Sequence, residues 1–230
     1  MAPFDSRESG DNLEAVCFDL DGVIVDSEPV HYEADRLALA AYDVPFTYEN
    51  KIKNYIGRTV KGTMFDLARA HQISDPDALL KERQAIFLEL IGTQLELRVG
   101  VLDLLLELFD RHLPCVLVTS GSRWYIDKVF ERFELGPFFA GMITVEDVSL
   151  HKPHPEPYLA GANLVEVLPE FCLAVEDSTA GVASAKSAGM YTIAAPSEMT
   201  RGSDLSKADA RIESFDELDL KKLDDLFGAK

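Results

Sequence analysis

The stretch that most constrains the fold is a short apolar run that ends in two aspartates. The run covers residues 15–18 (Ala-Val-Cys-Phe), and Asp19, Asp21 and Gly22 follow it. A run that is apolar on both faces is typical of a strand buried on both sides in a parallel sheet. Open parallel sheets bind their ligands beyond the carboxyl ends of the strands. Because residues two apart on an extended chain point the same way, we expect Asp19 and Asp21 to face one cleft.

Two neighbouring carboxylates repel each other unless a cation or a shared proton relieves the repulsion. Hard oxygen ligands suit Mg²⁺, so Asp19 and Asp21 indicate a magnesium site. A helix cap or a solvated turn is the alternative for an Asp-x-Asp-Gly stretch. A calcium-binding EF-hand loop does not fit, because it needs a preceding helix, a further acidic or amide ligand two residues after Asp21, and then a glycine.

The composition argues against several classes of partner. The chain of 230 residues is 47% hydrophobic, which is enough for a large core. Its 22 basic and 40 acidic residues give a formal net charge of −18, which would repel nucleic acid and anionic membranes. No apolar run reaches membrane-spanning length or resembles a signal peptide. We therefore expect a cytoplasmic monomer, with a loose polar tail over the first dozen residues.

The three cysteines, Cys17, Cys115 and Cys172, show no C-x-x-C pairing, and each lies inside an apolar run. A nucleophile or a metal ligand is one interpretation, and a small buried core residue is the other. The apolar surroundings favour core residues. Reduced thiols also agree with a cytoplasmic location.

Residues 29 to about 94 indicate only helices, with no convincing strand. Asp26 or Ser27 can cap the first helix, and Pro29 suits its first turn. The expected helices cover residues 29–41, a short segment after Thr47, a segment from Thr59 or Lys61 to Ala70, and a segment from Ser74 to a stop at Gly92. Because this block follows the first predicted strand directly, we expect an inserted helical cap domain over residues 28–97. The core domain then comprises residues 1–27 and 98–230.

From Gly100 onward helices and strands alternate, as they do in a parallel sheet with helices on both faces. Leu102, Leu105, Leu106 and Phe109 have the spacing of one face of an amphipathic helix. The expected strands cover residues 114–118, 142–144, 172–175 and 191–195, with a last short one at 210–212, and the expected helices cover 101–110, 123–133, 157–164 and 179–188. We therefore predict an α/β protein with a Rossmann-like, doubly wound parallel sheet.

Polar side chains follow four of the predicted strands, as Asp19/Asp21, Thr119/Ser120, Lys152 and Glu176/Asp177. In a parallel sheet these clusters converge on one edge. Acidic side chains there can hold magnesium, and a hydroxyl, backbone N–H groups and a lysine can hold a phosphoryl group. Each cluster has a simpler alternative, because the hydroxyl and acidic pairs can cap the following helices and Lys152 can be a solvated loop lysine.

This set of motifs resembles the haloacid dehalogenase superfamily of phosphotransferases. The motifs are Asp19-Leu-Asp21-Gly-Val, Thr119-Ser120, Lys152-Pro-x-Pro and Glu176-Asp177-Ser178, in the family's order over residues 15–195. The helical block resembles the helical cap of that family. The Asp26-Ser27-Glu28 continuation and the Glu-Asp-Ser-x-x-Gly run at 176–181 resemble the branch that contains β-phosphoglucomutase and sugar-phosphate phosphatases.

The resemblance implies a role for each motif. Asp19 would be the nucleophile that forms an aspartyl-phosphate, and Asp21 the general acid and base. Mg²⁺ would bridge Asp19, the backbone carbonyl of Asp21 and Asp177, with Glu176 helping directly or through water. Thr119 and the N–H groups of Ser120 and Gly121 would bind the phosphoryl oxygens. Lys152 would supply positive charge to the nucleophile and the transition state.

Other polar and aromatic residues carry weaker signals. In the cap, Glu28, His31 and Arg58 are candidates for contacting the part of the substrate that is not phosphate, although an ordinary solvated helix surface explains them about as well. His151 and His154 suggest zinc, but they lie in a proline loop without neighbouring cysteines or acidic residues, which favours simple loop polarity. Trp124 is expected to pack on its helix.

Three functions remain open at this point. The first is a magnesium-dependent phosphatase acting on a small phosphorylated metabolite, with a sugar or polyol phosphate as the expected substrate. The second is a sugar-phosphate mutase like β-phosphoglucomutase, which carries a cap arginine directly after the hydroxyl residue of a Gly-x-Ser. Here Gly57-Arg58-Thr59-Val60 departs from that pattern, but His31 keeps the mutase open, because that branch also has a histidine shortly after the first motif. The third is a non-catalytic domain that senses or binds phosphate, which the complete set of motifs disfavours.

Overall fold

Six parallel strands form the main sheet of the protein, in the order β5-β4-β1-β6-β7-β8. The computed structural model describes residues 13–55 and 59–228. The strands are β1 (Ala15–Phe18), β4 (Cys115–Val118), β5 (Gly141–Ile143), β6 (Cys172–Glu176), β7 (Tyr191–Ala194) and β8 (Ala210–Arg211). The chain starts in the middle of the sheet and winds outward in both directions, which confirms the predicted doubly wound fold.

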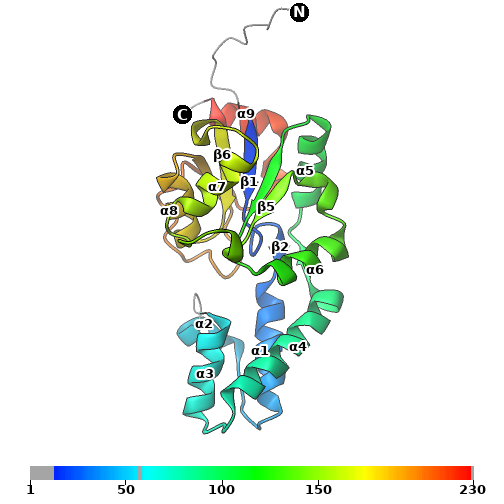
Figure 1. The fold of residues 1–230 in the computed structure, drawn as a ribbon, viewed down its shortest axis with the longest axis vertical. Helices are drawn as coiled ribbons and strands as arrows, with labels where there is room; N and C mark the ends of the chain where they lie inside the picture. Colours follow the sequence, from blue (N-terminus) through cyan, green and yellow to red (C-terminus); the bar gives the residue numbers. More distant parts are fainter. Residues whose placement is uncertain (1–12, 56–58, 229–230) are drawn as a thin grey trace, which may run out of the picture.

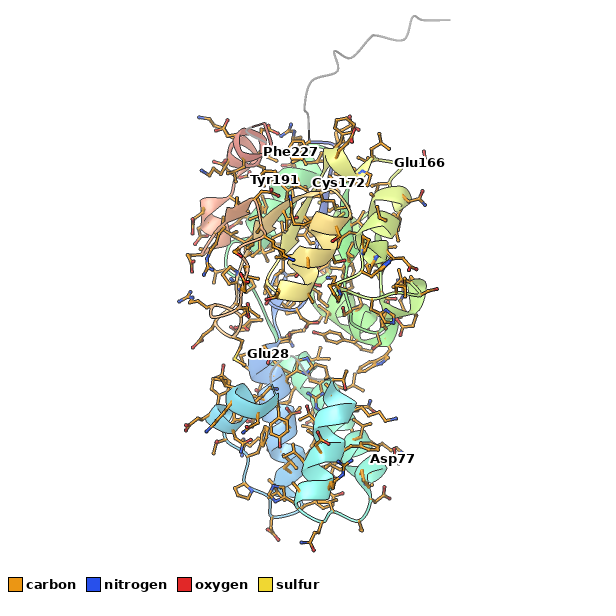
Figure 2. All side chains as sticks on the ribbon, turned by 90° about the vertical axis from the view of Figure 1, so that its left-hand side faces the viewer. Glu28, Asp77, Glu166, Cys172, Tyr191 and Phe227 are labelled. Carbon is orange, nitrogen blue, oxygen red and sulfur yellow. The ribbon has the colours of Figure 1, made fainter. Side chains whose placement is uncertain are left out.

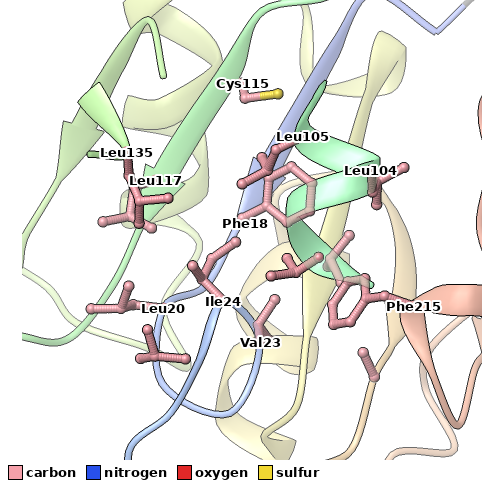
Figure 3. Close-up of a cluster of buried hydrophobic side chains, with 14 of the residues drawn as sticks. Phe18, Leu20, Val23, Ile24, Leu104, Leu105, Cys115, Leu117, Leu135 and Phe215 are labelled. Carbon is pink, nitrogen blue, oxygen red and sulfur yellow. The ribbon is translucent and has the colours of Figure 1, made fainter. Parts of the chain in front are cut away.

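Successive residues of the central strands point to opposite faces, and both faces are buried. Phe18 and Leu117 pack into one apolar cluster, whereas Cys17 and Val118 pack into another on the opposite face. Figure 3 shows the first cluster, where side chains of β1 and β4 meet those of α5 (Val101–Asp110), the helix that precedes β4. This two-sided burial explains why these strands are continuously apolar in the sequence.

Helices cover both faces of the sheet (Figure 1). The helices on the face of Phe18 are α5 (Val101–Asp110), α6 (Arg123–Phe133) and α9 (Leu220–Phe227), and those on the opposite face are α7 (Glu156–Leu164) and α8 (Thr179–Ser187). In the described part of the chain, short 3₁₀ helices cover Gly136–Phe138, Val145–Asp147, Pro169–Phe171 and Phe215–Glu217. The expected helices and strands of this part are thus present, with ends that differ by at most one residue.

The buried face of α5 differs from the expected one. Of the expected residues Leu105 is buried, but Leu102, Leu106 and Phe109 are exposed, and Leu104 and Leu108 are buried in their place. Most of this helix is apolar, so several faces satisfy the helical spacing equally well. Only packing against the sheet selects one of them.

Four further helices form a separate group on the side of the sheet where β1 ends (Figure 1). They are α1 (Glu28–Ala40), α2 (Tyr48–Tyr55), α3 (Val60–Ala70) and α4 (Pro76–Gln94). This helical group has its own apolar cluster, which includes Leu39, Phe46 and Met64. Gly92 does not end α4 as expected, because the helix continues for two more residues.

Two features of the fold were not expected. A short antiparallel ribbon of β2 (Val25–Asp26) and β3 (Glu96–Leu97) joins the chain where it enters and leaves the helical group. Helix α9 was not predicted either. Strands of two residues are too short to show a periodic pattern. In the part of the chain that the structure describes, no helix is long and apolar enough to cross a membrane.

A buried cluster of charges lies inside the helical group. Asp35 of α1 accepts hydrogen bonds from Lys51 of α2 at 3.0 Å and from Arg83 of α4 at 2.8 Å. All three side chains are less than a tenth exposed. Because an unpaired buried charge is costly, these contacts tie the three helices together in one arrangement.

Candidate active site

The strand ends bring the predicted polar residues side by side. Asp19 follows β1 directly, Thr119 follows β4, and Glu176 is the last residue of β6. Because β4 and β6 flank β1, the three residues lie next to one another at the carboxyl edge of the sheet. All three are buried. Asp19 therefore sits between a hydroxyl on one side and an acidic pair on the other.

Lys152 reaches this edge from the loop before α7. Its Nζ donates to Asp19 Oδ1 at 2.7 Å, to Glu176 Oε1 at 2.6 Å and to the carbonyl of Val118 at 2.8 Å. Burial alone would lower the pKa of this ammonium group, but the carboxylates of Asp19 and Glu176 raise it above its ordinary value. Lys152 is thus a fixed cation that orients Asp19, and not a solvated loop lysine.

Glu176 uses both of its oxygens within the protein. Oε1 accepts from Lys152 and from the Tyr158 hydroxyl at 2.8 Å. Oε2 accepts from the backbone N–H of Asp177 at 3.1 Å and from the Ser178 hydroxyl at 3.1 Å. A carboxylate has about four lone pairs to offer, so these donors occupy all of them. Glu176 therefore anchors Lys152 and the turn after β6.

Asp177 lies against the first loop of the site. Its Oδ2 accepts from the Thr200 hydroxyl at 3.0 Å. Gly22 has a φ of 77°, and a Cβ atom at this position would overlap the Asp177 carboxylate. Burial, followed by the charge of Glu176, raises the pKa of Asp177 to about 7. Only glycine allows the loop after Asp21 to approach Asp177 so closely.

The residues present fit a divalent cation. Oxygens of Asp19, Glu176 and Asp177 lie within 4.8 Å of one another, and all three side chains are buried. Burial raises the pKa of Asp19, and the neighbouring carboxylates raise it further against the opposing effect of Lys152. A cluster of buried carboxylates with one lysine has an excess of negative charge, which a hard cation would relieve.

The predicted phosphate-binding residues lie beside this cluster. Thr119 and Ser120 line the same pocket as Asp19 and Lys152. Thr119 Oγ1 accepts from the N–H of Gly121 at 3.0 Å, so this N–H group is engaged within the turn. Neither hydroxyl caps α6, because the N–H of Arg123 instead bonds to the Glu146 carboxylate at 3.1 Å.

Asp21 has a partner that sequence reasoning missed. The Tyr125 hydroxyl donates to Asp21 Oδ1 at 2.7 Å, across 104 residues of sequence. Burial raises the pKa of Asp21, while Ser27, Tyr125 and Lys152 oppose that rise. Tyr125 stands six residues after Thr119 on a predicted helix. No motif contains Tyr125, because its contact with Asp21 depends only on how α6 is oriented about its axis.

Two of the three predicted cap residues lie at the junction with the core. Glu28 lines the pocket of Asp19, and Figure 2 shows it where the helical group meets the core. Its Oε2 is buried without a hydrogen bond from any described residue, although Lys51 Nζ lies 3.8 Å away. His31 lines an adjoining pocket that shares Asp21 and Ser120 with the first. Arg58 lies outside the described residues.

His31 is held in one orientation by its neighbours. Its Nδ1 lies 2.7 Å from Nη2 of Arg83, and its ring stacks on Phe87 with 4.3 Å between centroids. Burial and the charge of Arg83 hold the pKa of His31 well below its ordinary value. Arginine is always a donor, so Nδ1 is the acceptor and the ring proton resides on Nε2.

The remaining sequence candidates have structural roles. Cys17, Cys115 and Cys172 are buried free thiols in the core, as expected. His154 accepts a hydrogen bond from the N–H of Glu156 within its loop, and the described residues place no metal-binding cluster around it. Trp124 packs on its helix only in part, with its ring edge-on to that of Tyr125 at 6.3 Å between centroids. It is 43% exposed and lines the pocket of His31.

The fold and the site together define a class of protein. A doubly wound sheet carries an acidic cluster and a buried lysine at its carboxyl edge, and a helical group lies over that edge. A model of the haloacid dehalogenase-like hydrolases matches residues 16–195. The chain belongs to this family and is an enzyme, so the resemblance seen in the motifs is confirmed.

Relatives of this chain include a protein that is named as a phosphatase of phosphorylated carbohydrates. The chain is similar to protein CbbY of Rhodobacter capsulatus, with 32% identity over 87% of this chain and 92% of CbbY. It is also similar to a phosphorylated carbohydrates phosphatase of Thermotoga maritima, with 32% identity over 79% of this chain and 84% of the relative.

A solved structure shares the same arrangement. The crystal structure of a putative β-phosphoglucomutase from Thermotoga maritima superposes with a TM-score of 0.82 at 28% identity, over 91% of this chain and 99% of that one. The proteins that this chain resembles thus include one named as a phosphatase and one named as a putative mutase.

Proposed function

We propose that this protein is a magnesium-dependent phosphatase that hydrolyses a small phosphorylated metabolite, most suitably a sugar or polyol phosphate, through an aspartyl-phosphate at Asp19. The observation that carries the proposal is a buried carboxylate, Asp19, held by Lys152 beside two further carboxylates in a pocket. The names of the relatives support the same substrate class.

Magnesium would be held by Asp19 and Asp177, with the backbone carbonyl of Asp21 as a further ligand. Both oxygens of Glu176 already accept hydrogen bonds. We therefore expect Glu176 to contribute its negative charge to the metal site without binding the ion directly. When bound, the ion offsets the repulsion between the Asp19 carboxylate and the anionic phosphate.

The chain's own residues would carry out the transfer in two steps. An oxygen of Asp19 attacks phosphorus while the bond to the leaving oxygen breaks, and Asp21 gives that oxygen its proton. Asp21 then takes a proton from water as the water attacks phosphorus, which releases phosphate and restores Asp19. Lys152 supplies positive charge throughout, and Thr119 and Ser120 would bind the phosphoryl oxygens.

Residues 28–97 would act as a cap that selects the leaving group. Glu28 Oε2 is a buried acceptor at the pocket, and an acceptor there suits a substrate hydroxyl and repels a carboxylate or second phosphate. His31 would offer its Nε2 proton to another substrate oxygen. Arg58, which lies outside the described residues, is proposed to contact the substrate only on the basis of its position in the sequence. These groups favour neutral, hydroxyl-rich leaving groups.

A mutase of the β-phosphoglucomutase type is the second candidate, because a structure of that name superposes well. A mutase needs a clamp for the second phosphate of its bisphosphate intermediate. Arg83 borders the pocket of His31 but is 2% exposed and already bonded to Asp35 and His31. It is thus poorly placed to serve as that clamp, which favours hydrolysis.

The test is a screen of phosphorylated metabolites that measures free phosphate and isomerised product separately. We expect phosphate release that requires Mg²⁺ and stops in excess chelator. One arm contains β-glucose 1-phosphate, Mg²⁺ and a trace of glucose 1,6-bisphosphate. Rapid formation of glucose 6-phosphate with little free phosphate would instead identify a mutase. Saturable binding of phosphate esters without any turnover would identify a phosphate-sensing domain.

A further inference from the structure

Tyr125 is a buried tyrosine at the centre of the site that none of the sequence motifs contains. Its side chain lies at the start of α6, it is 5% exposed, and its hydroxyl donates to Asp21 Oδ1 at 2.7 Å. A hydrogen bond to a carboxylate in a buried site is short, directional and strong. Tyr125 therefore restrains which oxygen of Asp21 can face a substrate.

The ring of Tyr125 is itself held from two sides. Phe87 of α4 packs on it with 5.5 Å between ring centroids, and Trp124 lies edge-on at 6.3 Å. Phe87 belongs to the helical group, whereas Asp21 belongs to the core, so the ring touches both sides of the pocket. Aromatic contacts of this kind limit the rotation of a ring and keep its hydroxyl in place.

We propose that Tyr125 is a positioning residue for the general acid and base. By occupying Oδ1 it leaves Oδ2 of Asp21 as the oxygen that gives a proton to the leaving group and later takes one from water. The proposal rests on the phosphatase function proposed above. It adds a residue whose hydroxyl bonds to Asp21, and which would act on the reaction through Asp21.

The consequence is a dependence on the leaving group. An alkoxide cannot depart without a proton, whereas p-nitrophenolate is stable enough to leave as the anion. A misplaced Asp21 should therefore slow the first transfer from an alkyl phosphate and leave the first transfer from p-nitrophenyl phosphate nearly unchanged. Because kcat/KM reports only the steps up to departure of the leaving group, it isolates this difference.

The experiment compares kcat/KM of the wild-type enzyme and Tyr125→Phe, with Mg²⁺ bound, on p-nitrophenyl phosphate and on the best alkyl phosphate from the screen. We expect a loss of roughly tenfold or more on the alkyl phosphate and less than about threefold on the aryl phosphate. Equal losses on both substrates, or no loss on either, would overturn the positioning role.

Tyr158→Phe is the matched control, because Tyr158 also donates from a buried phenol to a carboxylate, that of Glu176 at 2.8 Å. This bond supports Lys152 and not Asp21, so both substrates should lose the same factor. A wild-type enzyme that hydrolyses neither substrate would refute the phosphatase function itself. If the wild type is fully active and Tyr125→Phe changes kcat/KM by the same factor on the alkyl and the aryl phosphate, only the role of Tyr125 is refuted.

Discussion

At the scale of single residues, the site is a balance between one buried cation and several buried carboxylates. Lys152 contacts Asp19 and Glu176 at once, and its side chain is 6% exposed. The same ammonium group thus orients Asp19, the proposed nucleophile, and offsets the negative charge of Glu176 at the end of β6. Substitutions here are expected to change chemistry more than folding.

Asp19→Asn should abolish turnover and leave the fold intact, because an amide has nearly the same shape as a carboxylate but is a poor nucleophile. Phosphate release from p-nitrophenyl phosphate measures the activity, and circular dichroism checks the fold. A folded variant that keeps a rate near that of the wild type would show that Asp19 is not the nucleophile.

Lys152→Met should lower kcat by roughly 10²- to 10³-fold, with a smaller change in KM, because a preorganised charge acts mainly on the transition state. Lys186→Met is the matched control. It removes another lysine that is paired with an aspartate, Asp209 at 2.6 Å, but at the surface. Steady-state kinetics of both variants test this, and an unchanged kcat in Lys152→Met would contradict the role given to Lys152.

At the scale of elements, the helical group depends on charges that join its helices. Asp35 lies between Lys51 and Arg83, and Arg83 also holds His31. The cost of burying these charges is offset only while every partner is present. The same contacts place His31 at the pocket, so the packing of the helical group includes a residue that we propose to contact the substrate.

Arg83→Met should destabilise the protein by about 3 to 5 kcal/mol, because it removes one of the two cations that pair with the buried carboxylate of Asp35. Arg36→Met, on the same helix as Asp35, breaks a more exposed pair with Glu33 and should cost much less stability, because solvent screens such a pair. Urea unfolding followed by circular dichroism measures both. Equal costs would mean that burial of the Asp35 cluster contributes nothing to stability.

The low pKa of His31 predicts a loss of stability in acid. The unfolded chain takes up a proton on His31 below about its ordinary pKa of 6.5, but the folded protein does not. Stability should therefore fall as the pH falls below that value, by roughly 1.4 kcal/mol per pH unit from this residue. His31→Gln should lose less stability than the wild type between pH 7 and pH 5.5. Identical losses in urea unfolding would show that His31 titrates normally.

At the scale of the whole molecule, the helical group and the sheet domain meet at the cluster of buried carboxylates. Asp19, Glu176 and Asp177 are buried together at the edge of the sheet, on the side that the helical group covers. The proposed Mg²⁺ would bind the folded chain and not the unfolded one. Its binding should therefore be visible as added stability.

Magnesium at about a hundred times its dissociation constant should raise the Tm by roughly 5 to 10 °C at pH 8. Asp177→Asn should raise the Tm of the metal-free protein, because it removes one of the repelling carboxylates, and should abolish most of the rise with Mg²⁺. Differential scanning calorimetry with and without Mg²⁺ tests both effects. A variant that responds to Mg²⁺ like the wild type would exclude Asp177 as a ligand.

The core strands and their polar ends could be predicted because they depend on short-range patterns. Residues 15–18 are apolar on both faces, and a parallel sheet places the residue after such a strand at a known edge. The buried face of α5 could not be predicted in the same way. Its side chains are apolar on most sides, and only the sheet beneath decides which of them are covered.

The sequence by itself determined the fold class, the family and the edge at which Asp19, Lys152 and Asp177 meet, since strand periodicity and motif order are local properties of the chain. Tertiary structure alone decided that Tyr125 holds Asp21 and that Arg83 holds His31. These pairs are 104 and 52 residues apart. Their contacts depend on how helices rotate and pack against one another, and side-chain packing across such separations leaves no periodic trace in the sequence.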